Sequence, residues 1–384
     1  RRGNGSSRCA SPIAPVESIE RVVIVAYVTG HGYGHATRVG EVLRAVREQA
    51  PDLPLAVVTA APEKLFRDAV PGPFLFRSLE CDVGLAQKGP LVIDEEGTTR
   101  RWLEFARGRE ERAGDEARWL RGLGARLVLG DVPPLAFEAA AEAQVPAVGL
   151  ANFSWDWIYR HLAARQPELH EAADAAAAAY RTAALLLELP FAGDLSVFPR
   201  REPIPMVARH PRMSRVDARR RLGLPETEAC ALVSFGGLGM PAVTPGVLAG
   251  LAPVHFVIDA FEGSWPPNVT AVDAARRDAL GMGYQDLVQA ADVVVTKPGY
   301  GIVSDAIAAG TRIVYTERGD FPEYPIIVAE MPRYVPCAHV GNVDFLAGRW
   351  RPAIESVLAR PVPPPPDLRG AETASRRLVA LARG

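Results

Sequence analysis

The chain has 384 residues, 48% of them hydrophobic, and its 43 Lys and Arg residues nearly balance its 45 Asp and Glu residues. This length suits two domains rather than one core, and the balanced charge excludes a global attraction to nucleic acid or to an acidic membrane surface. No apolar run is long enough to cross a bilayer, and four cysteines without a CxxC pair indicate neither a zinc site nor a disulfide framework. We therefore expect a cytoplasmic protein with small-molecule partners and no integral membrane segment. Its oligomeric state is not indicated.

Residues 1–20 contain no long apolar stretch and are expected to be a disordered leader. After them, strand-like and helix-like segments alternate, which predicts a parallel sheet covered by helices on both faces. This first domain is expected over 21–190. The strands are expected at 22–28, 53–59, 74–78, 127–129, 147–150 and 184–189, and the helical segments at 36–49, 62–69, 99–123, 134–143 and 168–181.

A proline-rich stretch without clear periodicity, 191–212, predicts a linker. The same alternation resumes over 213–360, with helices expected at 214–222, 284–290 and 301–309 and strands at 231–235, 255–258, 293–296 and 312–315. Residues 361–384 combine a proline run with a closing helix. The expected fold is α/β, with two Rossmann-like doubly wound domains that face a central cleft.

The most informative segment is VVIVAYVTGHGYGHATRVGE (22–41), in which an apolar strand stops at a glycine-histidine loop and a helix begins. Such a junction presents unpaired backbone N–H groups at a sheet edge. Gly34 allows backbone to approach a ligand closely, and His31 and His35 place titratable imidazoles beside it. The spacing lacks the third glycine of the dinucleotide fingerprint, and no acidic residue ends the next strand, so NAD binding is not expected.

A second glycine loop lies in AADVVVTKPGYGIVSDAIAAG (290–310). Backbone N–H groups from Gly299 onward favour a phosphate at the start of the helix, and Lys297 adds a positive charge. Asp305 lies about one turn into the helix, where its carboxylate can accept hydrogen bonds from a ribose attached to that phosphate. The alternative is a plain turn followed by an amphipathic helix with a solvated Asp305.

The second loop, late in a two-domain α/β chain, resembles the donor-nucleotide site of GT-B glycosyltransferases. In particular it resembles the group that contains the N-acetylglucosaminyltransferase of peptidoglycan synthesis and monogalactosyldiacylglycerol synthase, in which a glycine-rich loop ends in a histidine where His35 stands here. A closer resemblance, over nearly the whole chain, is to the glycosyltransferase-like N-terminal region of plant L-arabinokinases, and four strings carry it. They are YVTGHGYGHATRV (27–39), GDVPPLAFEAAAEAQVP (130–146), ANFSWDWIY (151–159) and KPGYGIVSDAIAAG (297–310). The chain leaves no room for the sugar-kinase domain that follows in those enzymes, so kinase activity is not expected.

The resemblance implies an inverting glycosyltransferase that moves a sugar from a nucleotide diphosphate, expected to be UDP, to a hydroxyl-bearing acceptor. No cofactor beyond this nucleotide-sugar co-substrate is implied. For Arg318 and Asp320, a role as ion-pair partners within a loop is the open alternative. The residues with an implied role in donor binding are Gly34, Gly236, Gly237, Tyr284, Lys297, Gly299, Tyr300, Gly301, Asp305, Arg318 and Asp320.

His35 is the expected general base, because a neutral imidazole can take the proton of an attacking hydroxyl near pH 7. His31 is the second candidate. Asp131 follows a buried strand and can orient the imidazole. The alternatives are helix capping for Asp131 and a local backbone hydrogen bond for His35.

Four residues are candidates for acceptor binding: Asn152, Trp155 and Asp156 on an expected loop at the sheet edge, and Asp82 on an earlier loop. The alternative for the tryptophan is a place in the core. No metal is expected, because Asp94-Glu95-Glu96 lies in an expected loop without further ligands. Two other functions stay open, a hydrolysing sugar-nucleotide 2-epimerase and a non-catalytic sugar-nucleotide-binding module.

Overall fold

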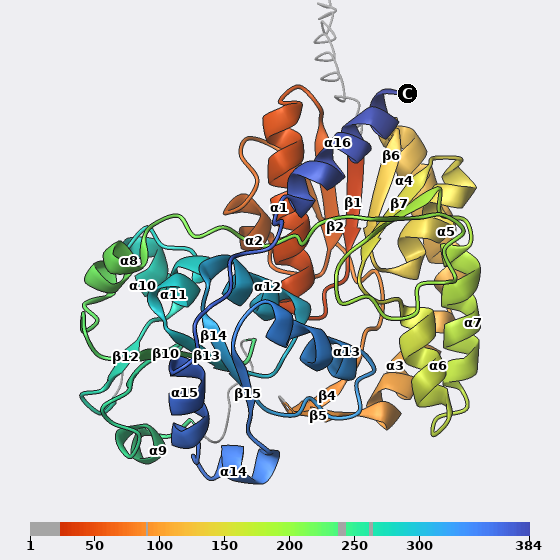
Figure 1. The fold of residues 1–384 in the computed structure, drawn as a ribbon. Helices are drawn as coiled ribbons and strands as arrows, with labels where there is room; N and C mark the ends of the chain where they lie inside the picture. Colours follow the sequence, from red (N-terminus) through yellow and green to blue (C-terminus); the bar gives the residue numbers. More distant parts are fainter. Residues whose placement is uncertain (1–23, 90, 237–242, 261–263) are drawn as a thin grey trace, which may run out of the picture.

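The computed structural model describes residues 24–89, 91–236, 243–260 and 264–384, and its two large sheets lie in separate halves of the molecule (Figure 1). The sheet of the first half is parallel throughout, with strand order β3-β2-β1-β6-β7-β8-β9. Its strands are β1 (Ile24–Val28), β2 (Leu55–Thr59), β3 (Leu75–Ser78), β6 (Leu127–Asp131), β7 (Ala147–Ala151), β8 (Leu185–Glu188) and β9 (Arg201–Pro203).

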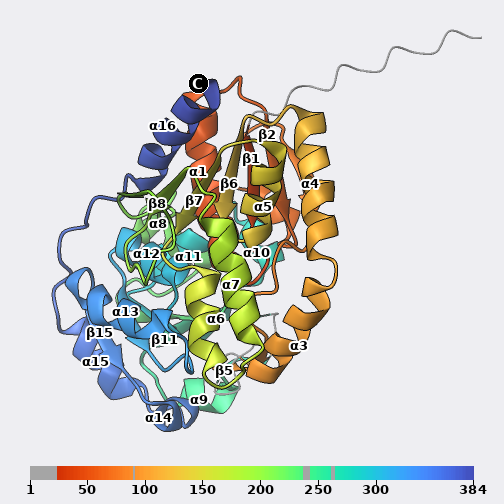
Figure 2. The same ribbon diagram turned by 90° about the vertical axis from the view of Figure 1, so that its right-hand side faces the viewer.

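Helices cover both faces of this first sheet, as the turned view shows (Figure 2). Successive residues of a strand point to opposite faces. Ile24 therefore joins the core on the side of α1 and α16, whereas Val25 joins the core on the side of α4, α5 and α7. The helices of this half are α1 (Tyr33–Gln49), α2 (Glu63–Arg67), α3 (Glu95–Ala106), α4 (Arg109–Leu123), α5 (Pro134–Ala143), α6 (Trp155–Ala163), α7 (Leu169–Tyr180) and the last helix of the chain, α16 (Gly370–Arg383).

The second sheet is also parallel, with strand order β12-β11-β10-β13-β14-β15. Its strands are β10 (Cys230–Ser234), β11 (His255–Ile258), β12 (Val269–Ala271), β13 (Val293–Thr296), β14 (Arg312–Tyr315) and β15 (Cys337–His339). The helices around it are α8 (Arg215–Leu222), α9 (Pro245–Ala249), α10 (Ala274–Ala279), α11 (Tyr284–Ala290), α12 (Tyr300–Ala309), α13 (Glu323–Glu330), the 3-10 turn η1 (Met331–Arg333), α14 (Asn342–Leu346) and α15 (Arg351–Leu358). A small hairpin, β4 (Gln87–Gly89) and β5 (Val92–Ile93), completes the fold.

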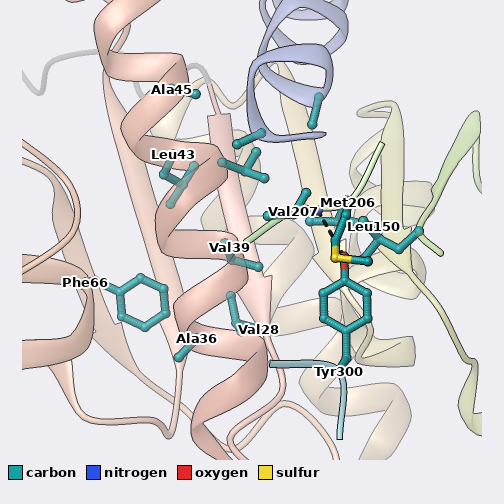
Figure 3. Close-up of a cluster of buried hydrophobic side chains, with 14 of the residues drawn as sticks. Val28, Ala36, Val39, Leu43, Ala45, Phe66, Leu150, Met206, Val207 and Tyr300 are labelled. Carbon is teal, nitrogen blue, oxygen red and sulfur yellow. Dashed lines mark hydrogen bonds between the residues drawn. The ribbon is translucent and has the colours of Figure 1, made fainter. Parts of the chain in front are cut away.

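One apolar core runs without interruption from the first half into the second (Figure 3). Tyr300 at the start of α12 points toward Met206, Val207 and Leu150, and its hydroxyl accepts a hydrogen bond from the Val207 N–H at 3.0 Å. Burial of a continuous apolar surface stabilises the contact between the two halves. The arrangement of residues at the boundary between the halves is therefore held in place by packed side chains.

The structure differs from the expected elements at several places. It adds β12, β15, α9, α10 and α13 to α15 to the expected second half. The segment Asp94-Glu95-Glu96, expected in a loop, is the N-cap and first turn of α3. The charged segment at 99–123 is two helices, because the chain breaks at Gly108, the N-cap of α4. The expected loop around Trp155 and Asp156 is the start of α6, with Ser154 at its N-cap. The expected linker at 191–212 adds strand β9 to the first sheet. No helix of the described ranges is long and apolar enough to cross a membrane.

Candidate active site

His35 and Asp131 meet at the carboxyl edge of the first sheet. His35 lies in the first turn of α1, and its Nδ1 is 2.8 Å from Oδ1 of Asp131, the last residue of the neighbouring strand β6. The ring of Phe153 contacts the imidazole edge-on, with 5.5 Å between the ring centroids. Asp131 is fully buried and caps no helix, and the partners of His35 are side chains rather than local backbone. The sequence-based pairing of these two residues is therefore present in the structure.

Arg38, which the sequence analysis missed, holds the same carboxylate. Its Nε lies 2.6 Å from Asp131 Oδ2 and its Nη2 lies 2.5 Å from Oδ1, a bidentate ion pair. Burial disfavours the charged carboxylate, but the charges and hydrogen bonds of Arg38 and His35 together outweigh this effect and lower the pKa of Asp131 below its ordinary value. The signal in the sequence was an arginine three residues after His35, on the same helix face.

The ionised Asp131 determines which nitrogen of His35 carries the proton. A carboxylate only accepts hydrogen bonds, so the 2.8 Å contact assigns the proton to Nδ1. The Arg38 Nη2 atom is also 3.0 Å from Nδ1, and a hydrogen bond from it would require the opposite tautomer. The contact to the charged acceptor is the shorter one, which leaves Nε2 as the nitrogen with a free lone pair.

A second histidine–carboxylate pair lies beside the first. His31 Nε2 donates to the backbone carbonyl of Asp82 at 2.9 Å and lies 3.3 Å from Asp82 Oδ1. Asp82 also accepts hydrogen bonds at 2.8 Å from Thr29 Oγ1 and from Trp155 Nε1. Burial lowers the pKa of His31, but the hydrogen bond and charge of Asp82 outweigh it, so the net shift is upward. Asp82 is therefore engaged by protein groups on both oxygens.

The other acceptor-binding candidates are also engaged or buried. Asn152 accepts from Arg38 Nη1 at 2.8 Å and donates to Glu323 Oε1 at 2.6 Å. Trp155 is buried and stacks on Tyr159, with 5.5 Å between the ring centroids, so it lies in the core. Asp156 is buried, one of its carboxylate oxygens makes no hydrogen bond to the residues that the structure describes, and burial raises its pKa.

The second glycine loop lies against the first. Gly299 is the N-cap of α12, and a Cβ atom on Gly301 would lie only 3.0 Å from the Cα atom of Gly34. The N-termini of α1 and α12 therefore meet at backbone distance. Lys297 Nζ lies 3.4 Å from Gln87 Oε1, and burial, aided by the charge of the nearby arginine, lowers the lysine pKa to about 8.

Three more donor-binding candidates are Tyr300, Gly236 and Gly237, and the last two follow β10 in the chain. Tyr300 is turned into the core between the halves (Figure 3). Gly236 ends the described part of its loop with a φ of 68°, a value that favours glycine. Gly237 lies outside the described residues.

Asp305 is buried rather than solvated, and its carboxylate is bound by Arg209. Arg209 Nε lies 3.1 Å from Oδ2, Nη2 makes a second contact to the same oxygen, and the backbone N–H of Arg209 donates to Oδ1 at 3.3 Å. The same guanidinium lies 5.7 Å from the ring centroid of Tyr284, whose hydroxyl donates to Ser234 Oγ at 2.6 Å. Asp305, Arg209 and Tyr284 thus form one cluster, of which sequence reasoning found two members.

Arg318 forms an ion pair within the second half, and Asp320 forms ion pairs with residues of the first half. Arg318 Nη1 donates to Glu323 Oε2 at 2.7 Å and to the carbonyl of Pro298 at 3.2 Å. Asp320 lies 2.9 Å from His161 Nε2 and 2.5 Å from Arg165 Nη2, both in the first half. The ion-pair alternative therefore describes the contacts of both residues. Within the described ranges, no group of His, Cys, Asp and Glu side chains is arranged to hold a metal ion.

Comparison with known proteins bears on the fold. No protein-family model matches the chain. The chain is 30% identical over 376 residues to an L-arabinokinase of Arabidopsis thaliana, a match that covers 96% of this chain but only 35% of that protein. The chain thus spans about a third of the length of this relative.

Two solved structures share the arrangement of both halves. One is a UGT transferase from Siraitia grosvenorii in complex with UDP, with a TM-score of 0.55, 12% identity and coverage of 94% of this chain and 100% of that one. The other is the glycosyltransferase VinC in complex with dTDP, with a TM-score of 0.57, 14% identity and coverage of 94% and 95%. With two parallel sheets and this similarity, the chain has the two-domain α/β fold of GT-B glycosyltransferases.

Proposed function

We propose that the protein is a glycosyltransferase that moves a sugar from a nucleotide-diphosphate sugar, UDP-linked, to a hydroxyl group with inversion at the anomeric carbon. The observation that carries the proposal is the position of the His35–Asp131 pair directly beside the meeting point of two helix N-termini. A base and an anion-binding helix start are the two parts that such a transfer needs.

The proposed step moves one proton and exchanges one bond. His35 Nε2 takes the proton of the acceptor hydroxyl, whose oxygen attacks the anomeric carbon as the bond from that carbon to the diphosphate breaks. Backbone N–H groups at the start of α12 and the Lys297 ammonium then stabilise the departing diphosphate. Asp131 stabilises the imidazolium that forms, as a buried carboxylate does in a hydrolase triad.

A screen of thermal shifts with UDP, GDP, ADP, dTDP and their sugar conjugates tests the donor site, because a ligand that binds only the folded state raises the melting temperature. We expect a selective shift with UDP or a UDP-sugar. A shift with a different nucleotide would identify that nucleotide, instead of UDP, as part of the donor. No shift with any of them would favour a non-catalytic module. With the donor known, NMR of the product anomer tests inversion.

A second candidate is hydrolysis of the nucleotide sugar, in which water is the acceptor. The observation that favours it is the packing beside the base. The ring centroid of Phe321, from the second half, lies 6.0 Å from that of Phe153, whose ring contacts His35. Both phenylalanines are buried. These aromatic rings fill space that a large acceptor would need. Release of free sugar from the nucleotide sugar alone would support hydrolysis, as in hydrolysing 2-epimerases, whereas a requirement for added acceptor would exclude it.

A further inference from the structure

A chain of buried polar side chains connects the His35–Asp131 pair to the second half of the molecule. Arg38 donates to Asn152 Oδ1 at 2.8 Å, Asn152 Nδ2 donates to Glu323 Oε1 at 2.6 Å, and Arg318 donates to Glu323 Oε2 at 2.7 Å. Arg38, Asn152 and Glu323 are each buried. The chain ends on the second glycine loop, where Arg318 also donates to the carbonyl of Pro298.

Each charge in this chain is matched within its own half, and the link that depends on docking of the two halves is the hydrogen bond from Asn152 to Glu323. Arg38 neutralises Asp131, Arg318 neutralises Glu323, and the neutral amide of Asn152 bridges the two ion pairs. A buried polar group without a partner costs free energy. Loss of Glu323 would leave the Asn152 amide without its acceptor, and the amide would be free to rotate away from Arg38.

Arg38 is held from both sides of the boundary. Its guanidinium carbon lies 5.1 Å from the ring centroid of Tyr300, which belongs to α12. The guanidinium must be oriented correctly, because Nη2 lies within reach of both Asp131 Oδ1, at 2.5 Å, and His35 Nδ1, at 3.0 Å. If it turned toward the imidazole, it would donate to Nδ1 and select the tautomer whose proton is on Nε2, which cannot act as a base.

We propose that Arg38 is a positioning residue that keeps the lone pair of His35 on Nε2, and that its hydrogen bond to Asn152, anchored by Glu323, makes this depend on docking of the second half. The inference rests on the proposed role of His35 as a base. It adds that His35 can act as a base only when the second half is docked against the first. In an open molecule His35 would then not activate water, and the nucleotide sugar would be protected from hydrolysis.

The test measures the tautomer of His35 directly. The protein is labelled with ¹⁵N-histidine, and correlations between ring nitrogens and carbon-bound ring protons distinguish the Nδ1–H from the Nε2–H form. The chain has seven histidines, and the signals of His35 are those lost in His35→Gln. We expect the Nδ1–H form in the wild-type protein at pH 8, and a mixture that includes the Nε2–H form in Glu323→Ala and in Asn152→Ala.

Glu317→Ala is the matched control. Glu317 lies in the loop before α13, the helix that begins at Glu323, and it pairs with His339 at 3.1 Å, outside the chain that reaches Arg38. This variant should keep the wild-type signature of His35. A wild-type signature in both Glu323→Ala and Asn152→Ala would overturn the proposal, as would an Nε2–H form in the wild-type protein.

Substitution of Arg38 itself needs a conservative variant. Arg38→Met would leave Asp131 buried without a countercharge and could fail to fold. Arg38→Lys keeps the charge but not the planar fork, so we expect a folded protein with mixed His35 tautomers. Calorimetry with UDP on the same samples keeps the two proposals apart. If wild-type protein fails to bind UDP, the proposed function fails while the tautomer result still decides the role of Arg38.

Discussion

Gly34 and Gly301 lie so close together at the boundary between the halves that a side chain on Gly301 would press on the Gly34 backbone. A Cβ atom on Gly301 would lie 3.0 Å from the Gly34 Cα atom, and one on Gly34 would lie 3.7 Å from the Gly301 nitrogen. The first distance is tighter than normal contact and involves backbone, which cannot rotate away. Two glycine loops that are 267 residues apart in the chain therefore act as one structural unit.

Gly301→Ala should separate the N-termini of α1 and α12. We expect a loss of stability of about 1–3 kcal/mol, the usual cost of overpacking, measured as a lower midpoint of urea unfolding, together with weaker UDP binding. Gly122→Ala in α4 is the control, since its Cβ atom would meet no atom of the described residues within 4 Å, and it should not reduce stability. Wild-type stability and UDP affinity in Gly301→Ala would show that the close contact is not required.

His35→Gln should remove the base and leave the donor site intact. A positioned general base contributes about 10²–10⁴-fold to the rate, so turnover of the nucleotide sugar found by the thermal-shift screen should fall by that factor. UDP affinity, measured by calorimetry, should stay unchanged. The control His170→Gln changes an exposed histidine on α7. Full turnover in His35→Gln would assign the base elsewhere, with His31 as the next residue to substitute.

Asp305→Ala and Arg209→Met distinguish a role of the Asp305 carboxylate in UDP binding from its role in stabilising the fold. Loss of Asp305 should weaken UDP binding by about 1–3 kcal/mol through lost charged hydrogen bonds. It should also lower stability, because Arg209 keeps a mostly buried charge. Arg209→Met should retain UDP affinity or improve it, because the carboxylate becomes free for the ribose. Equal losses of UDP affinity in both variants would mean that the ion pair only supports the fold.

Donor affinity should fall as the pH rises through about 8, where Lys297 loses its charge. The pKa of this lysine is lowered to about 8, so the ammonium is present below that pH and lost above it. Calorimetric titrations with UDP between pH 6.5 and 9.5 should show weaker binding at the alkaline end in the wild-type protein. Lys297→Gln should bind more weakly at pH 6.5 and lack this dependence. An identical pH profile in both proteins would remove Lys297 from the donor site.

Local sequence patterns were sufficient for the elements that carry the first loop. The apolar run of β1, the glycine loop and the helical periodicity of α1 are contiguous, so their physical causes lie within one segment. Parallel strands also end at one sheet edge, and this is why His35 and Asp131, 96 residues apart, could be paired in advance. The helix at Trp155 was missed because its apolar and aromatic residues fit a buried loop equally well.

The sequence by itself determined the α/β plan with its two glycine loops and histidines at strand ends, because strand, turn and helix propensities act over a few neighbouring residues. Only the tertiary structure decided the partners of each charged group. Arg209 reaches Asp305 across 96 residues and Asn152 reaches Glu323 across 171. The pairing of Asn152 with Glu323 depends on how the two halves dock, and the burial that makes each pairing necessary arises only when distant segments have packed together.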